Sequence, residues 1–293
     1  MSFVISTDTS ANLPTAELQW HQLYLLPFSY IVNEVEHQCL DLSAFDGDAY
    51  YEMLRHTPAS TSMISMDQYR QLWEPLLEEG HDILHVGMSS GISGAYQSAV
   101  MAARELREEY PQRRLVVFDT RAASLGEGIQ VLHAATCREA GYTLDETVRE
   151  LAELRPRIRQ IFTVDDLMHL RRGGRVSGVA AAVGTALRIK PLLKGDEAGR
   201  IVVFGKVQGR KRSVRALADN FAANAELLGR WPIGIAHAGC RDEALALAAM
   251  LKESAPKARI IIVDHEPVTG SHVGPGALAM FYVAKEPWPS AIC

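Results

Sequence analysis

Serines and glycines crowd one short segment of the sequence, Val86–Gly94 (VGMSSGISG), between an apolar run and an amphipathic one. Residues Gly87–Gly91 fit the G-x-S-x-G pattern of a nucleophile elbow, in which Ser89 would attack a carbonyl carbon. Asp264 and His272 follow it in the Ser, Asp, His order of such hydrolases. The same segment could instead bind an anion, because a glycine loop at the start of a helix presents free N–H groups and the positive end of the helix dipole.

The surroundings of this serine loop favour binding over hydrolysis. Only two predicted strands precede the one that leads into Ser89, whereas the elbow of an α/β-hydrolase usually follows several strands and a separate oxyanion loop, and no HGGG-type segment is present. Ser93, at the start of the predicted helix, has no task in hydrolysis. It could bind a ligand, or it could simply cap the helix by accepting an N–H bond. Hydrolysis by Ser89 remains the alternative hypothesis.

Short apolar runs alternate with helical patterns along the chain, which indicates an α/β fold. The predicted strands are Phe3–Thr7, Tyr24–Val32, Asp82–Gly87, Leu115–Asp119, Gln160–Val164, Ile201–Val207, Pro232–Ala236, Arg259–Val263 and Leu278–Val283. Apolar residues at helical spacing predict helices over Gly94–Tyr110 and Ser213–Leu228. Capping boxes at Ser65–Gln68 and Thr143–Glu146 predict two further helix starts. We place a domain boundary near residue 158, giving domains of residues 1–158 and 159–293.

Composition excludes several classes of function. A net charge of −5 over 293 residues argues against binding nucleic acid over a broad surface. Four isolated cysteines suit a reducing compartment, and neither a signal peptide nor a membrane-spanning run is visible, so we expect a cytoplasmic protein without stable membrane insertion. No Walker A loop, dinucleotide fingerprint or metal-ligand spacing appears, so we expect no cofactor and no metal. With no apolar stripe left over, we expect a monomer.

Five motifs in order over some 270 residues carry a resemblance to a known family. They are FVISTDTSANLP at Phe3–Pro14, SSGISGAYQSA from Ser89, FDTRAASLG from Phe118, LRRGGRVS from Leu170 with the following Ile189-Lys190-Pro191, and HVGPG at His272–Gly276. The chain resembles the DegV family, which includes the fatty-acid-binding subunits of bacterial fatty acid kinase. The resemblance implies two α/β domains, the first built on a mainly parallel sheet flanked by helices, with the ligand between them.

The resemblance also implies a function and a site. It implies a non-catalytic carrier that buries a long-chain fatty acid and presents its carboxylate to an ATP-dependent kinase subunit, which forms an acyl phosphate for phospholipid metabolism. The residues implied to bind the carboxylate are Thr61, Ser62, Ser93, Gly94 and His272. Arg171 or Arg172 would lie near the head group on the surface that faces the kinase. On this interpretation the serines bind and do not attack.

Three details of the sequence qualify this hypothesis. Thr61–Ser65 reads TSMIS where the family usually has TSQPS, so the geometry of Thr61 and the preferred chain length are open. Val179–Leu187 is apolar nearly all round and rich in small residues, which predicts a buried helix that either packs closely or leaves room for a ligand. Asp8 follows the first strand, and we favour a structural role for it, bonding loop amides, over a ligand role.

Overall fold

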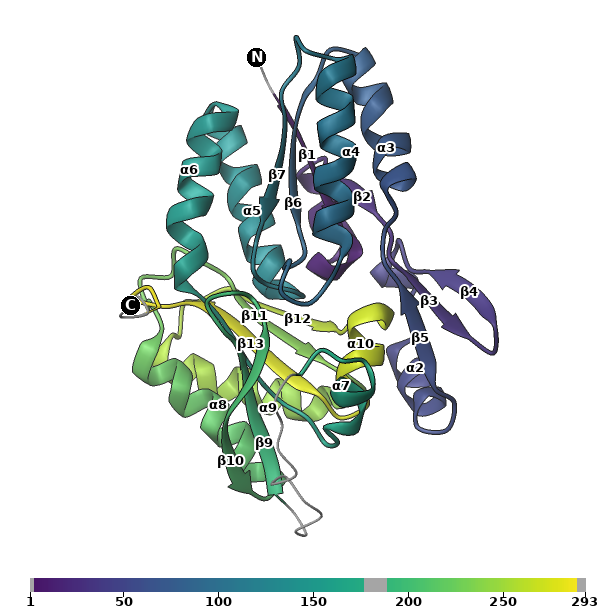
Figure 1. Cartoon of the computed structure of the whole chain (residues 1–293). Coiled ribbons are helices and arrows are strands. Elements are labelled where there is room, and N and C mark those ends of the chain that lie inside the picture. The colour runs from purple at the N-terminus through teal and green to yellow at the C-terminus, as the bar shows by residue number, and fades with distance from the viewer. Residues whose placement is uncertain (1–2, 177–188, 289–293) are drawn as a thin grey trace, which may run out of the picture.

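A four-stranded parallel sheet forms the centre of the first half of the chain in this computed structural model, which describes residues 3–176 and 189–288 (Figure 1). The strands are β1 (Phe3–Asp8), β2 (Tyr24–Leu26), β6 (Asp82–Gly87) and β7 (Leu115–Asp119), in the order β2-β1-β6-β7. All neighbouring pairs in this sheet are parallel. The carboxyl ends of β1, β6 and β7 therefore meet at one edge, where an α/β sheet usually presents its ligand site.

Helices cover both faces of this sheet. They are α3 (Met66–Glu78) and α4 (Ala95–Glu109) on one face and α5 (Leu125–Glu139) and α6 (Leu144–Leu154) on the other, with the short α1 (Thr15–Trp20) after β1. Helices α3 and α6 begin with complete capping boxes, which confirms the predicted starts at Ser65 and Thr143. The predicted helix from Gly94 is α4, with Gly94 as its N-cap and Tyr110 as its C-cap.

A small three-stranded sheet projects from this half of the molecule (Figure 1). It contains β3 (Ser29–Val32), β4 (Val35–Gln38) and β5 (Ala59–Ser62) in the order β4-β3-β5, and α2 (Gly47–Leu54) precedes β5. The prediction of one strand over Tyr24–Val32 is wrong, because the segment divides between two sheets. Pro27 lies at the division, where it cannot donate a ladder hydrogen bond.

The second half of the chain forms a six-stranded sheet. Its strands are β8 (Ile158–Thr163), β9 (Ile189–Gly195), β10 (Ile201–Gln208), β11 (Ile233–His237), β12 (Ile260–Asp264) and β13 (Leu278–Val283), in the order β10-β9-β8-β13-β11-β12. The β11–β12 pair is parallel and the other pairs are antiparallel. Helices α8 (Arg210–Asn224) and α9 (Arg241–Ser254) pack on one face of this sheet. Helix α8 is the helix predicted over Ser213–Leu228, but it begins and ends a few residues earlier.

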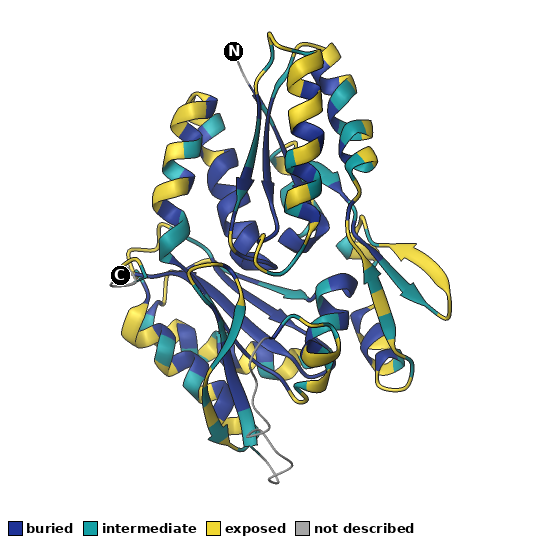
Figure 2. Cartoon of the chain, in the orientation of Figure 1, coloured by how far each residue is buried: buried dark blue, intermediate teal, exposed yellow. Residues whose placement is uncertain are grey.

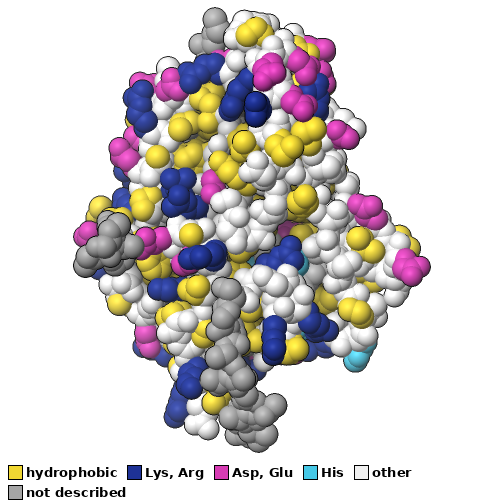
Figure 3. Space-filling model, viewed as in Figure 1, with side chains coloured by type: hydrophobic (Ala, Val, Ile, Leu, Met, Phe, Trp, Pro, Cys, Tyr) yellow, Lys and Arg dark blue, Asp and Glu magenta, His cyan; other side chains and the backbone are white. Residues whose placement is uncertain are grey.

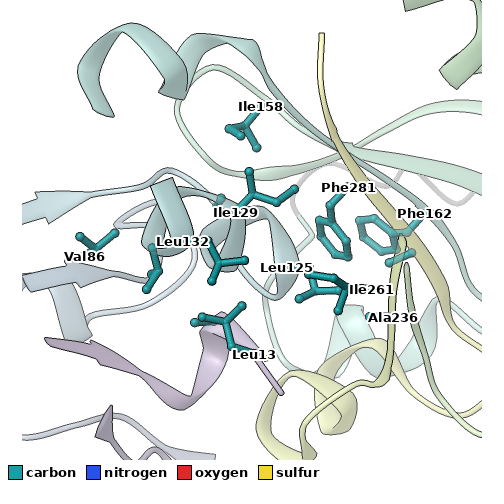
Figure 4. Packing of buried hydrophobic residues seen from close by; sticks show 14 of the residues in the cluster. Leu13, Val86, Leu125, Ile129, Leu132, Ile158, Phe162, Ala236, Ile261 and Phe281 are labelled. Carbon is teal, nitrogen blue, oxygen red and sulfur yellow. The ribbon is translucent and has the colours of Figure 1, made fainter. Parts of the chain in front are cut away.

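The other face of this sheet packs against α5 of the first half. Leu125 and Ile129 of α5 belong to one buried cluster with Phe162 of β8 and Phe281 of β13 (Figure 4). A Cβ on Gly234 would lie 2.6 Å from the Cβ of Leu125, so only glycine allows this approach of helix and sheet. Helix α5 is consequently buried along most of its length, unlike α4 and α6 (Figure 2).

Two short helices, α7 (Met168–Arg172) and α10 (Pro267–Val273), lie where the two halves meet (Figure 1). The helix predicted over Val179–Leu187 lies outside the described residues. Over residues 3–176 and 189–288, no helix combines the length and apolarity needed to cross a bilayer.

Candidate functional site

A cavity of about 840 Å³, including the space at its mouth, lies between the two halves of the chain. Most of its wall is apolar, and the lining side chains that give it this character are Phe28, Met63, Met88, Ile92, Phe162, Leu170, Ile201, Val268, Val273, Ala279 and Phe281. Nine polar side chains of the described residues also line the cavity. The cavity therefore suits a mainly apolar ligand that carries a polar group.

Thr61 and His272 meet at one part of the cavity wall, although 211 residues separate them in sequence. Thr61 lies on β5, and its Oγ1 is 3.0 Å from Nε2 of His272, in the last turn of α10. Both residues line the cavity, as does Ser62 beside them. A methyl group on Gly173 would overlap Nδ1 of His272, so Gly173, directly after α7, makes room for the imidazole. The structure thus brings together three of the predicted carboxylate ligands.

The pKa of His272 is lowered to about 4, first by burial and then by the charge of Arg175. The imidazole is therefore neutral at neutral pH, and it can share one proton with the hydroxyl of Thr61. A carboxylate placed beside this pair would receive hydrogen bonds and would favour protonation of the imidazole.

Ser93 lines the same cavity from the loop between β6 and α4. Its Oγ accepts the N–H of Ala95 at 3.2 Å, which leaves the hydroxyl proton free to be donated. The N-cap position of α4 is occupied by Gly94, which makes no side-chain bond, so Ser93 is not the N-cap. Gly94 is absent from the cavity wall. A Cβ there would lie 2.8 Å from Sδ of Met63, so Gly94 admits Met63 against the loop.

Asp8 holds the start of this loop. Its Oδ2 accepts the N–H of Met88 at 3.1 Å, and its Oδ1 accepts both the N–H and the hydroxyl of Ser10. The hydroxyl of Ser10 also lies 2.6 Å from Oε2 of Glu127. Burial raises the pKa of Asp8 and that of Glu127, and the charge of Asp8 raises the pKa of Glu127 further. The structural role predicted for Asp8 matches these contacts.

Ser89 is fully buried and is placed for structure rather than attack. Its hydroxyl donates to the carbonyl of Gly199 at 2.9 Å and accepts the N–H of Gly91 at 3.0 Å. The turn between β9 and β10, which contains Gly199, covers the hydroxyl. The hydrogen-bond partners of Ser89 include neither Asp264 nor His272, and His272 is engaged with Thr61. The geometry gives no support to the hydrolase alternative.

A second, polar depression of about 1,110 Å³, including open space, adjoins the cavity and shares Thr61, Arg175 and His272 with it. Its lining includes three arginines, Arg55, Arg172 and Arg175, and three histidines, His56, His169 and His272, against the single carboxylate of Asp166. Lys and Arg side chains gather near the middle of the face shown in Figure 3, at the level where the two halves meet. Of the two predicted arginines, Arg172 lines this depression, and the exposed Arg171 does not.

Arg175, the third arginine that flanks the glycine pair, lines both the cavity and the depression. Sequence reasoning missed His265, which lies seven residues before His272 and also lines the cavity. In the described part of the chain, no group of three or more His, Cys, Asp or Glu side chains is arranged to hold a metal ion.

Comparison with known proteins agrees with this geometry. A family model described as an uncharacterised protein family, DegV, matches residues 2–285. A DegV domain-containing protein of Clostridium perfringens is 36% identical over 97% of this chain and 99% of its own length.

Two solved structures have the same fold. A fatty acid binding DegV family protein from Streptococcus agalactiae is 30% identical, with a TM-score of 0.84 over 98% of this chain and 100% of the other. A DegV family protein from Thermus thermophilus, described by its fatty acid binding, is 28% identical, with a TM-score of 0.85 over 97% of this chain and 100% of the other.

Proposed function

The chain belongs to the DegV family, and we propose that it is a fatty-acid carrier that buries an acyl chain between its two halves and presents the carboxylate to a partner kinase. The observation that carries the proposal is the apolar cavity with Thr61, Ser93 and His272 on its wall. The fatty acid binding of the solved relatives from S. agalactiae and T. thermophilus supports it.

A fatty acid would gain binding free energy from both the apolar wall and the polar side chains of the cavity. Each buried methylene contributes about 0.8 kcal/mol, so a chain of about sixteen carbons could contribute on the order of 12 kcal/mol before the costs of binding. Burial of an unpaired carboxylate would cost several kcal/mol and cancel much of this gain. Hydroxyl donors from Thr61 and Ser93, with the imidazole of His272, would offset that cost because hydrogen bonds to charged groups are strong. The carboxylate therefore belongs at these three side chains.

Native mass spectrometry of the purified protein tests the carrier function. We expect one long-chain fatty acid per chain, released on denaturation, or uptake of added hexadecanoate at that ratio. A protein that is empty and takes up no fatty acid would contradict the proposal. A fluorophosphonate probe tests the alternative: we expect no labelling, because the hydroxyl of Ser89 is buried, and labelling at Ser89 would favour hydrolysis.

Presentation to a kinase is the second part of the proposal. A carboxylate oxygen at Thr61 would attack the terminal phosphorus of ATP held by the partner, forming an acyl phosphate and releasing ADP. The polar depression supports this, because it adjoins the head-group residues and its three arginines would attract phosphate groups. We propose that the carrier is a cytoplasmic monomer that meets the kinase through this face.

The two neighbouring arginines provide a matched test. We expect Arg172→Glu to bind hexadecanoate as the wild type does but to lose most acyl-phosphate formation in a reconstituted assay with an ATP-dependent fatty acid kinase subunit. Arg171→Glu, with the same charge change outside the depression, should retain more of this activity. Equal turnover by the wild type and both variants would contradict the assignment of the depression to the kinase.

A further inference from the structure

Helix α10 and the residue before its N-cap line part of the cavity wall, through His265, Val268, Thr269, His272 and Val273. The last four lie within α10, whereas His265 precedes the N-cap Glu266, whose backbone is extended. At about 1.5 Å per helical residue and about 3.3 Å per extended one, the chain advances roughly 10–14 Å from His265 to His272. His272 lies at the head-group end, so His265 is placed well along the path of a bound chain.

The imidazole of His265 is held by a chain of hydrogen bonds from the other half of the protein. Asn12 accepts the N–H of Glu266 through Oδ1 at 2.8 Å, which fixes the orientation of its amide. Its Nδ2 then donates to the carbonyl of Asp264 at 3.0 Å and to Oγ of Ser124 at 3.3 Å. Oγ of Ser124 lies 3.5 Å from Nδ1 of His265. Ser124, which also lines the cavity, has a φ of 52°, and only its surroundings hold it there.

Two buried polar atoms of residues on this wall, Nε2 of His265 and Oγ1 of Thr269, have no hydrogen-bond partner among the described residues. The side chain of His265 is only 2% exposed. Burial and the neighbouring His237 lower the pKa of His265 to about 3, so the ring is neutral at neutral pH. By contrast, the amide of Gln160 on the same wall is paired at both ends, with Ala123 and Arg121. An unpaired buried polar group is costly, so a ligand that satisfied Nε2 of His265 would gain affinity.

The two tautomers of His265 both suit a hydroxyl group. If Ser124 donates to Nδ1, then Nε2 carries the proton and requires an acceptor. If Nδ1 donates to Ser124, then Nε2 requires a donor and the proton of the Ser124 hydroxyl is also free. A hydroxyl both donates and accepts, so it can pair with either arrangement. An unsubstituted hydrocarbon chain can pair with neither.

We propose that His265 and Ser124 form a second polar station in the cavity, and that the preferred ligand is a long-chain fatty acid with a hydroxyl group near the middle of its chain. The proposal rests on the proposed carrier function, because the head group must lie at His272. An extended chain advances roughly 1.25 Å per carbon, so 10–14 Å corresponds to about eight to eleven carbons beyond the carboxyl group. A hydroxyl at about carbon 9 to 12 of an octadecanoic acid would therefore reach His265.

Isothermal titration calorimetry with positional isomers tests this station. We expect the wild-type chain to bind 10-hydroxyoctadecanoic acid about tenfold more tightly than 17-hydroxyoctadecanoic acid, a difference of about 1.4 kcal/mol, the scale of one buried hydrogen bond. The isomers have equal polarity, so the ratio reports position alone. His265→Phe, which keeps a planar ring without polar atoms, should abolish the ratio, and Ser124→Ala should reduce it.

The outcomes separate this proposal from the carrier function. Equal binding of the two isomers by the wild-type chain, alongside binding of octadecanoate, would overturn the polar station and leave the carrier function standing. A tenfold preference that His265→Phe retained would also overturn it, since another group would then hold the hydroxyl. Failure of octadecanoate and both isomers to bind would overturn the two proposals together.

Discussion

Replacement of Ser93 by alanine is the sharpest test of where the ligand's charge lies. The Ser93 hydroxyl lines the cavity and already accepts the N–H of Ala95, so its remaining capacity is to donate one proton. In the proposed complex that proton goes to the carboxylate. Ser93→Ala removes this donor while keeping the Cβ, and the bond to Ala95 lies at the helix start, where water can replace it.

The expected loss follows from the charge of the acceptor. A hydrogen bond to a charged group contributes about 1.5–3 kcal/mol, so Ser93→Ala should weaken hexadecanoate binding by about 10- to 150-fold. A neutral acceptor contributes only about 0.5–1.5 kcal/mol, so the loss for hexadecanol should be about 2- to 12-fold. The difference between the two ligands isolates the contribution of charge, because their apolar chains are the same.

Calorimetric titration of both ligands into wild type, Ser93→Ala and Ser90→Ala provides the assay. Ser90 is the matched control: it lies three residues earlier in the same loop, is exposed, donates to Oδ2 of Asp119 at 2.6 Å and is absent from the cavity wall. Its substitution should change the affinity by no more than about threefold, as is usual for a surface site.

Two results would refute this reasoning. If a folded Ser93→Ala chain bound hexadecanoate as tightly as the wild type, the carboxylate would not lie at the serine loop. If hexadecanoate and hexadecanol lost affinity equally, Ser93 would face the ligand without meeting its charge. Unchanged thermal unfolding of the variant is required for either conclusion.

Three further predictions follow from the packing. Burial lowers the pKa of His85 to about 3, so between pH 7 and 5 the unfolded chain binds a proton at this residue and the folded chain does not. The free energy of unfolding should therefore drop by about 2 kcal/mol over this range through His85 alone. Urea titrations of His85→Phe should show a correspondingly weaker dependence of stability on pH. Gly173→Ala would push His272 away from its place on the cavity wall, so hexadecanoate affinity should fall at least about tenfold, whereas Gly205→Ala, whose added methyl meets nothing closer than 3.5 Å, should bind normally; equal binding by both would contradict the close packing on His272. Ser89→Ala leaves the carbonyl and N–H partners of the hydroxyl unpaired, so chemical denaturation should show a loss of about 1–3 kcal/mol, and a stable variant would show that this buried bridge contributes little.

The sequence determined the local elements of the fold well. The capping boxes at Ser65 and Thr143, the strand Leu278–Val283 and the helix after Gly94 lie where the patterns predict them. Such features depend on residues within a few positions of one another, so the sequence contains their whole cause. The division of Tyr24–Val32 was missed because its two parts pair with strands from different sheets, although Pro27 marked the place.

The membership of the site came from sequence motifs, but its geometry was decided only by tertiary structure. Nothing local distinguishes Ser89 from Ser93, since both are loop serines among glycines. Ser89 is structural because a turn 110 residues away in sequence covers its hydroxyl, whereas Ser93 lines the cavity. His265 lacked any motif, and its unpaired nitrogen arises where α10 meets Ser124 and Asn12 from the other half of the chain. Burial and hydrogen-bond partners depend on segments that folding brings together, so the chemistry of each side chain is settled only when the two halves pack.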